Sequence, residues 1–151
     1  MDAAGQRELA VSTFSRVWEL LELAERTPEE IDEMIHAVHV SCYVWSKIGG
    51  PANVARGEWQ CARVYSTLGR ADSALWHARR CLQLAEAGGE GFEDWDLPGA
   101  HQALAHAHLA AGDTSEARRW AALARAGVAR VEDPEDREVI EGQIAELGLE
   151  D

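Results

Sequence analysis

Apolar residues recur along this chain at the three- and four-residue spacing of amphipathic helices, and no segment shows the alternation of a β-strand. Glycine and proline interrupt the pattern at intervals and divide the chain into seven segments. The pattern predicts helices at about residues 6–26, 28–48, 52–68, 71–87, 97–111, 114–130 and 134–147. We therefore expect an all-α protein of about seven helices.

Two of these helices have strong start signals. Thr27 precedes Pro28 and lies three residues before Glu30, which is the spacing of a capping box. Asp133 precedes Pro134 in the same way at the last helix. A proline at the first helical position needs no backbone hydrogen bond there, so both starts are predicted firmly.

Residues 62–82 and 105–125 repeat one pattern. In each copy a helix ends at a glycine, Gly69 or Gly112, and the next helix carries small residues at positions i, i+4 and i+7. These small residues are Ala74, Ala78 and Cys81 in the first copy, and Ala117, Ala121 and Ala124 in the second. The repeat predicts stacked helical hairpins. We expect one domain over residues 1–151, with three antiparallel hairpins at about 6–48, 52–87 and 97–130 and a C-terminal capping helix at 134–147.

Composition narrows the choice of partner and compartment. With 151 residues, 46% of them hydrophobic, the chain can bury a sizeable core, and its formal net charge is −13. Such an acidic chain repels phosphate groups, so we expect neither nucleic-acid nor membrane binding. The charged residues 1–20 do not resemble a secretory signal, so we expect a cytoplasmic protein. Cys42, Cys61 and Cys81 each fall on an apolar helix side, which favours buried reduced thiols over disulfides or a zinc site.

The predicted helix at residues 28–48 has a second face that is chemically rich. Glu33 and His36 form a Glu-x-x-His pair, and His39 lies one turn further on, a spacing that suits a metal ion. A di-metal bundle needs a second such pair, which the chain lacks. The favoured interpretation is therefore histidines hydrogen-bonded at a helix interface. A ligand pocket that includes Tyr43 is the remaining alternative.

The predicted helix at residues 52–68 carries Arg56, Trp59 and Arg63 along one stripe, with Glu58 beside it. Guanidinium groups form bidentate hydrogen bonds and an indole offers a stacking surface, so this stripe suits a carboxylate, an acidic peptide or a flat ring. The alternative is that the two arginines pair with acids of neighbouring helices and that Trp59 packs against them.

The second half of the chain leaves two questions open. Trp95 lies in the one long connection, where it is either a lid over a groove or a plug that anchors the connection. His101 and His108 share one helix face, which favours partly buried neutral histidines in helix packing, whereas His106 points elsewhere.

The repeat copies resemble the tetratricopeptide superfamily. The resemblance rests on Tyr65, Leu68-Gly69, Ala74 and Cys81, and on Leu104, Ala105, Gly112, Ala117 and Ala124. A wider likeness, to a family of small uncharacterised bacterial tetratricopeptide-like proteins, covers Arg26-Thr27-Pro28-Glu29-Glu30, His36-x-x-His39, Trp45, Ala55-Arg56-Gly57-Glu58-Trp59 and Leu68-Gly69-Arg70. Members of that family carry a histidine where this chain has Val44. The resemblance implies a short right-handed solenoid in which Arg56, Trp59 and Arg63 face a concave groove.

These observations favour a non-catalytic binding or scaffold protein. We expect it to recognise a protein segment or a small ligand through a groove, without a cofactor. The expected site residues are Arg56, Glu58, Trp59 and Arg63, with His36, His39 and Tyr43 adjoining.

Two alternatives remain. One is a small-molecule enzyme or metal-binding protein that uses Glu33, His36 and His39. The chain has no nucleophile elbow, phosphate-binding loop or dinucleotide glycine pattern, so no motif supports an enzyme. The other is a homo-oligomer subunit, which six tryptophans in 151 residues suggest.

Overall fold

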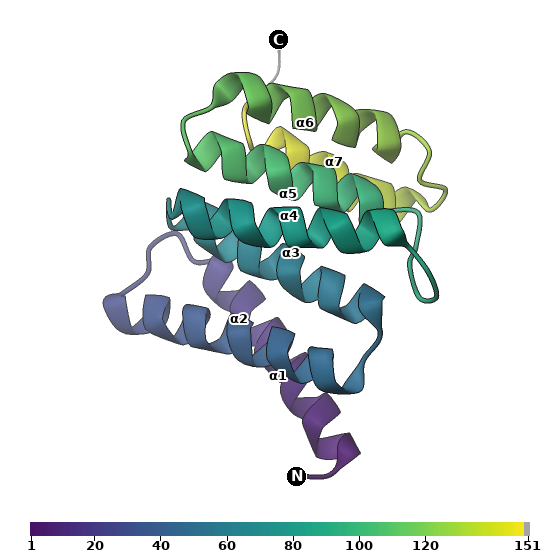
Figure 1. Cartoon of the computed structure of the whole chain (residues 1–151). Coiled ribbons are helices and arrows are strands. Elements are labelled where there is room, and N and C mark those ends of the chain that lie inside the picture. The colour runs from purple at the N-terminus through teal and green to yellow at the C-terminus, as the bar shows by residue number, and fades with distance from the viewer. Residues whose placement is uncertain (150–151) are drawn as a thin grey trace.

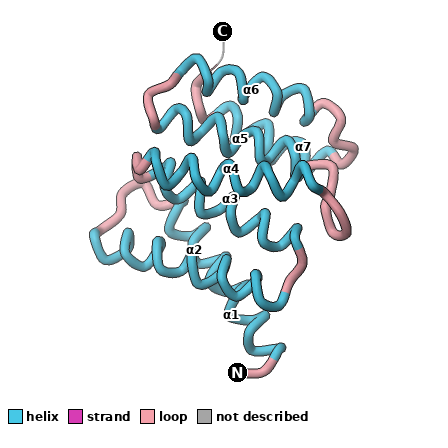
Figure 2. Tube along the Cα trace, viewed as in Figure 1, coloured by secondary structure: helices cyan, strands magenta, loops and turns pink. Residues whose placement is uncertain are grey.

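The computed structural model describes residues 1–149, and within them it contains seven helices and no strand. The helices are α1 (Ala3–Leu21), α2 (Pro28–Ile48), α3 (Pro51–Thr67), α4 (Ala71–Ala87), α5 (Asp96–Ala110), α6 (Thr114–Val128) and α7 (Pro134–Ala145). Figures 1 and 2 show this all-helical architecture, which confirms the predicted fold class. None of the seven helices has the length and apolar character needed to cross a bilayer.

Helix α1 ends at Leu21, so the prediction that it continues to Arg26 is wrong. The guanidinium group of Arg26 donates hydrogen bonds to the backbone carbonyls of Leu20, at 3.3 Å, and Leu23, at 2.9 Å. A side chain that satisfies carbonyls at a helix end replaces the backbone donors of a further turn. Arg26 therefore terminates α1 from outside rather than extending it.

The predicted start of α2 is confirmed. The hydroxyl of Thr27 accepts a hydrogen bond from the backbone N–H of Glu30 at 3.1 Å, and the Glu30 carboxylate accepts one from the backbone N–H of Thr27 at 2.9 Å. Both halves of the capping box are thus present, and Pro28 occupies the first turn.

Gly69 and Gly112 end α3 and α5 in the same way. Both have positive φ angles, 74° and 78°, which a glycine adopts without a steric penalty. In both turns the residue after the glycine donates its N–H to a carbonyl five positions back, Arg70 to Tyr65 at 2.8 Å and Asp113 to His108 at 2.9 Å. These bonds define a Schellman motif, so the repeated sequence forms a repeated turn.

The helices form two layers. Consecutive helices pack in pairs, α1 with α2, α3 with α4 and α5 with α6, while α7 packs on α5 and α6. In Figure 1, α2, α4 and α6 form the front layer, and α1, α3, α5 and α7 lie behind them. We call this second set the inner layer. It is continuous, because α1 contacts α3, α3 contacts α5 and α5 contacts α7.

The predicted small residues of α4 and α6 lie in the protein interior. Ala74, Ala78, Ala117, Ala121 and Ala124 are fully buried, and Cys81 is nearly so. Three apolar clusters fill the interior: one among α1, α2 and α3, one among α3, α4 and α5, and one mainly among α5, α6 and α7. Successive clusters share α3 and α5, so the apolar interior extends from α1 to α7.

Candidate functional site

The predicted site residues do not converge on one cavity. They lie in three places. Arg56, Trp59 and Arg63 are on the inner layer, and His39 and Glu58 lie between α2 and the α3–α4 pair. The outer surface of α2 carries Glu33, His36 and Tyr43. Each place has its own chemistry.

A cavity of about 370 Å³ opens on the inner layer, and we call it the groove. Helices α1, α3, α4, α5 and α7 all contribute to its lining. The long connection, residues 88–95 between α4 and α5, contributes its last residue, Trp95. Most of the lining is aromatic or aliphatic, and its large apolar members are Phe14, Trp18, Trp59, Trp95, Val139 and Ile140. The groove therefore offers stacking surface and apolar contact more than hydrogen bonds.

Arg56 lies in the groove wall with its guanidinium group already occupied. It donates to both carboxylate oxygens of Asp96, at 3.1 and 2.9 Å, and to the carbonyl of Gly91 at 3.0 Å. The same group lies over the ring of Trp95, 4.5 Å from its centroid. Arg56 thus holds the long connection against α3, and Trp95 is part of the groove wall.

Trp59 and Arg63 are also engaged within the chain. The indole N–H of Trp59 donates to the carbonyl of Gly99 at 2.9 Å, and its ring lies 5.6 Å from that of Trp18. Arg63 pairs with Glu146 at 2.9 Å, and its guanidinium group lies over the rings of Trp18 and Trp59. Both arginines of the predicted stripe therefore have a carboxylate partner from a neighbouring helix.

Among the described residues, one acidic side chain of the groove has no basic partner. Asp136 lines the groove, and within residues 1–149 no basic side chain forms an ion pair with it. Desolvation raises the pKa of the Asp136 carboxyl group, and the nearby carboxylates of Asp133, Asp94 and Glu135 raise it further. One rim of the groove is therefore negative, whereas Arg56 in its wall is neutralised by Asp96.

The outer surface of α2 does not gather a metal site from Glu33, His36 and His39. Glu33 accepts two hydrogen bonds from Arg16 of α1, at 2.8 and 3.0 Å, and the pKa of its carboxyl group is lowered by this partner. His36 is exposed, and Tyr43 is 65% exposed. Only His39 turns inward, so the three predicted ligands point to different surroundings.

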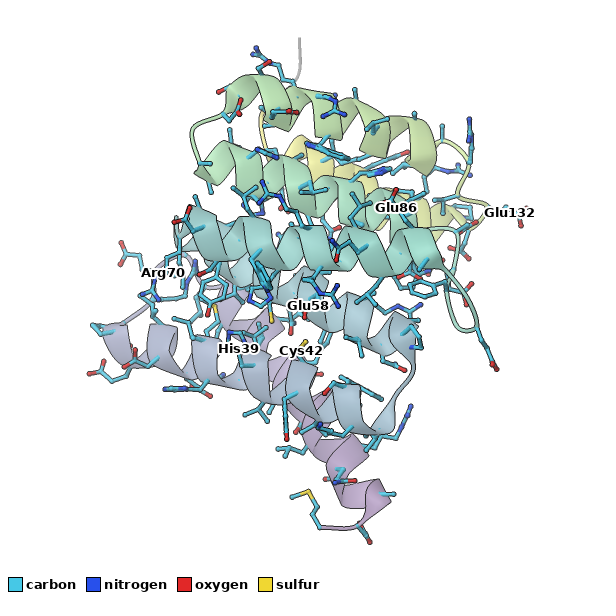
Figure 3. All side chains as sticks on the ribbon, in the orientation of Figure 1. His39, Cys42, Glu58, Arg70, Glu86 and Glu132 are labelled. Carbon is cyan, nitrogen blue, oxygen red and sulfur yellow. The ribbon has the colours of Figure 1, made fainter. Side chains whose placement is uncertain are left out.

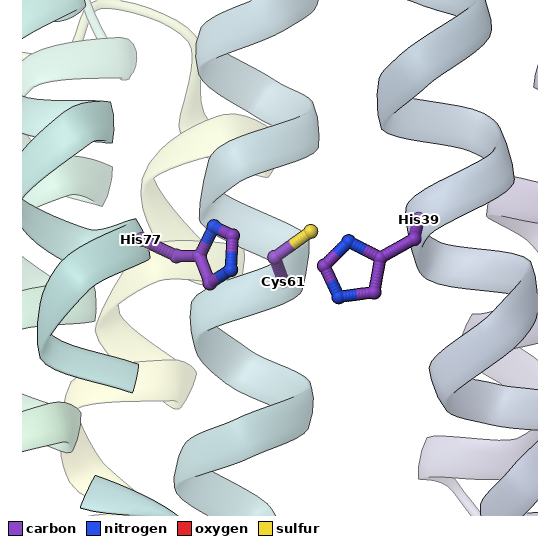
Figure 4. A group of neighbouring side chains, drawn as sticks. All are labelled: His39, Cys61 and His77. Atoms are coloured by element: carbon purple, nitrogen blue, oxygen red, sulfur yellow. The ribbon is translucent and has the colours of Figure 1, made fainter. Parts of the chain in front are cut away.

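His39 belongs to a cluster that the sequence analysis did not assemble, which we call the histidine–cysteine cluster: His39, Cys61 and His77. One ligand atom from each residue, an imidazole nitrogen or the thiol sulfur, lies within 4.8 Å of the other two. Figure 4 shows the Cys61 sulfur between the two imidazole rings. The three residues come from α2, α3 and α4, so the cluster joins the first helix pair to the second.

Each histidine of this cluster is held by a further side chain. The Glu58 carboxylate accepts a hydrogen bond from Nδ1 of His77 at 2.5 Å. Nε2 of His39 lies 2.8 Å from the Tyr65 hydroxyl, and the Tyr65 and His77 rings are stacked. Figure 3 shows His39 and Glu58 in the space where α2 faces α3 and α4. Both imidazoles are thereby fixed in orientation.

The surroundings favour the neutral form of His39 and the thiol form of Cys61. Burial lowers the pKa of His39, and the neighbouring His77 lowers it further. Hydrogen bonding with Cys42 and burial raise the pKa of the Cys61 thiol well above its usual range. At neutral pH His39 is therefore neutral and Cys61 is a thiol, so Cys61 is not an activated nucleophile.

The sequence predicted Cys61 only as a buried thiol and did not single out His77, although it contains a signal for their pairing. Cys61 lies eight residues before Gly69, and His77 lies eight residues after it. In an antiparallel hairpin, residues at equal distances from the turn face each other, so the glycine turn already predicts this pair.

The histidines of α5 differ in part from the prediction. His101 packs 5.6 Å from Trp120, and burial lowers its pKa, in keeping with a neutral histidine in helix packing. His106, which was not predicted to pack, is also partly buried. Burial lowers the pKa of His106 to about 4, with a smaller contribution from Arg63.

Comparison with known proteins finds no matching family model, no significantly similar curated protein and no significantly similar solved structure.

Proposed function

We propose that this chain is a tetratricopeptide-like helical-repeat protein that binds a segment of a partner protein in the groove, without catalysing a reaction. The observation that carries the proposal is the lining of the groove, where four aromatic rings from α1, α3 and the long connection surround one open cavity. Aromatic and apolar linings of this kind are typical of binding sites in soluble proteins.

The partner segment inserts an aromatic or aliphatic side chain. A volume of about 370 Å³ lies near the lower end of the roughly 300–1,000 Å³ typical of small-molecule pockets, so the groove suits one anchor rather than an extended ligand. Large apolar anchors supply most of the affinity in such interfaces.

The anchor is flanked by a basic residue. Arg56 and Arg63 are already paired with Asp96 and Glu146, so they offer little to an acidic ligand. Asp136 at the rim has no such partner among the described residues, and the chain as a whole has a net charge of −13. Complementary charge therefore favours lysine or arginine beside the anchor.

Val139 offers a test that leaves the core intact. Its side chain lines the groove yet is 58% exposed, so Val139→Arg changes the groove without burying a charge. Leu123 on α6 provides the matched control, because it is 42% exposed and outside the groove lining. We expect peptides selected from a displayed random library to bind V139R at least tenfold more weakly, and L123R as tightly as wild type.

The selected sequences test the charge argument separately. We expect the selected peptides to contain an aromatic or aliphatic residue beside Lys or Arg. Asp136→Asn should weaken the binding of such a peptide. It should have a smaller effect on the binding of the same peptide with Gln in place of its basic residue. Enrichment of the same peptides on V139R as on wild type would show that binding occurs elsewhere. A library that yields no binder, or binders dominated by acidic residues, contradicts the proposal.

A further inference from the structure

We propose that His39, Cys61 and His77 bind a transition-metal ion of the zinc type, with three ligands from the protein and the fourth position open to water. This site is separate from the groove and independent of its proposed function. It also differs from the set Glu33, His36 and His39, of which it retains only His39.

The three ligand atoms are nearly in place. In a tetrahedral zinc site with bonds of about 2.0–2.3 Å, ligand atoms lie about 3.3–3.8 Å apart. The nitrogens and sulfur of the cluster lie within 4.8 Å of one another, so side-chain movements of about 1 Å bring them to a common centre. His39 and His77 are partly exposed while Cys61 is buried, so an ion reaches the sulfur from the side of the rings.

The hydrogen bonds around the cluster are those of ligating histidines. Because a carboxylate only accepts, Nδ1 of His77 donates its N–H to Glu58, so Nε2 is the nitrogen available to an ion. The Tyr65 hydroxyl occupies Nε2 of His39 and leaves Nδ1 for an ion. Metal-bound histidines usually donate their other N–H to a fixed acceptor in this way, which sets the tautomer and the ring orientation.

The donor set selects the metal. Two imidazole nitrogens and one thiolate suit Zn²⁺ and related ions, whereas Mg²⁺ and Ca²⁺ prefer oxygen ligands. On binding, the Cys61 thiol transfers its proton to solvent and the sulfur forms the bond to the metal, so one proton is released and no electron is transferred. The thiol that is inert in the metal-free chain thus becomes a ligand.

Co²⁺ is a direct probe of this geometry. We expect reduced protein without a polyhistidine tag to bind one Co²⁺ per chain, with the absorption of tetrahedral Co²⁺ and a thiolate-to-cobalt charge-transfer band. Cys61→Ser should abolish that band, and Cys81→Ser, a buried cysteine outside the cluster, should retain it. Equimolar Zn²⁺ should displace the cobalt.

Histidine variants locate the other two ligands. His39→Gln and His77→Gln should each weaken Zn²⁺ binding, measured by calorimetry, at least tenfold. His36→Gln should leave it unchanged, because His36 lies one turn away on the same helix and is exposed. Glu58→Gln should weaken binding about tenfold, as expected of a residue that orients a ligand.

The cobalt spectra can overturn the proposal in two ways: the wild-type protein shows no charge-transfer band at saturating Co²⁺, or the band persists in C61S. Equal affinities of H36Q, H39Q and H77Q for Zn²⁺ overturn it as well. Far-ultraviolet circular dichroism verifies that each variant is folded. The wild-type spectrum decides the question without any variant, because a chain with no thiolate band does not bind the ion through Cys61.

Discussion

Gly57 lies at a point where α3 and α2 approach so closely that a methyl group does not fit. A Cβ atom added there would lie 2.9 Å from Sγ of Cys42 and 3.2 Å from both Cα and Cβ of the same residue. The sulfur can rotate away, but the Cα and Cβ atoms move only with α2 itself. Gly57→Ala therefore forces the two helices apart by a few tenths of an ångström.

Two opposing effects decide the size of the change. Replacing glycine by alanine inside a helix stabilises the folded state by about 0.5–1 kcal/mol, because the unfolded chain loses conformational freedom. Overpacking a tight contact costs about 1–3 kcal/mol. Since the clash at Gly57 involves backbone, the second effect is larger. We expect a net loss of about 1 kcal/mol in the free energy of unfolding, and a fall in Tm of about 2–4 °C for a chain of this size.

Gly142 supplies the matched control for the helix-propensity effect. It is an exposed residue of α7, and no atom lies within 4 Å of an added Cβ. Gly142→Ala should therefore stabilise the protein by about 0.5 kcal/mol. Urea unfolding followed by circular dichroism measures both variants. If G57A is stabilised as much as G142A, the close approach of α2 and α3 is absent and the reasoning fails.

Two further substitutions have defined outcomes. The pKa of His106 is about 4 in the folded protein and about 6.5 when unfolded, so the unfolded state binds the proton first as pH falls. The titration of His106 does not change the stability above pH 6.5, and it destabilises the fold by up to about 3 kcal/mol near pH 4. His106→Gln should therefore flatten the pH dependence of Tm between these two values. An unchanged profile contradicts the burial of His106. Thr27→Ala removes the hydroxyl that caps α2 and should lower the free energy of unfolding by about 1 kcal/mol in urea, whereas Thr27→Ser, which keeps the oxygen, should lose less than half of that.

The local features of the fold were predictable because their causes lie within a few residues. The capping box at Thr27 and the glycine turns at Gly69 and Gly112 need only neighbouring residues to form their hydrogen bonds. The buried alanines of α4 and α6 follow from helical periodicity in the same way. The end of α1 differed from prediction because Arg26, although close in sequence, folds back onto the helix and stops it.

The polar face of α2 shows that helical periodicity alone does not identify residues of one site. Glu33, His36 and His39 are spaced three residues apart, and each step of three turns the helix by about 300°. Over six residues the direction drifts by about 120°, so Glu33 and His39 point to different neighbours. Glu33 meets Arg16 of α1, and His39 meets Tyr65 of α3. A shared face in sequence is therefore not a shared site when the helix is covered on two sides.

The contacts of Arg56 depend on how α3 and α5 are placed side by side, which no local pattern states. Arg56 bonds to Asp96 and Trp59 bonds to Gly99, and both pairs are separated by 40 positions. The two equivalent glycine turns, however, are separated by 43. Contacts between α3 and α5 are thus displaced by three residues, nearly one helical turn, relative to the repeat itself. An alignment of the two sequence copies gives the turns correctly and the contacts wrongly.

The long connection depends on the same placement of α5 beside α3. Its final residue, Trp95, stacks against the guanidinium group of Arg56. Asp96, the first residue of α5, pairs with the same guanidinium group. The Asp96 carboxylate also accepts a hydrogen bond from the backbone N–H of Glu93 at 2.8 Å. These contacts fix the connection against α3 and place a fourth aromatic ring in the groove. The long connection is therefore the segment that completes the cavity wall, which no pattern within α3 or α5 alone predicts.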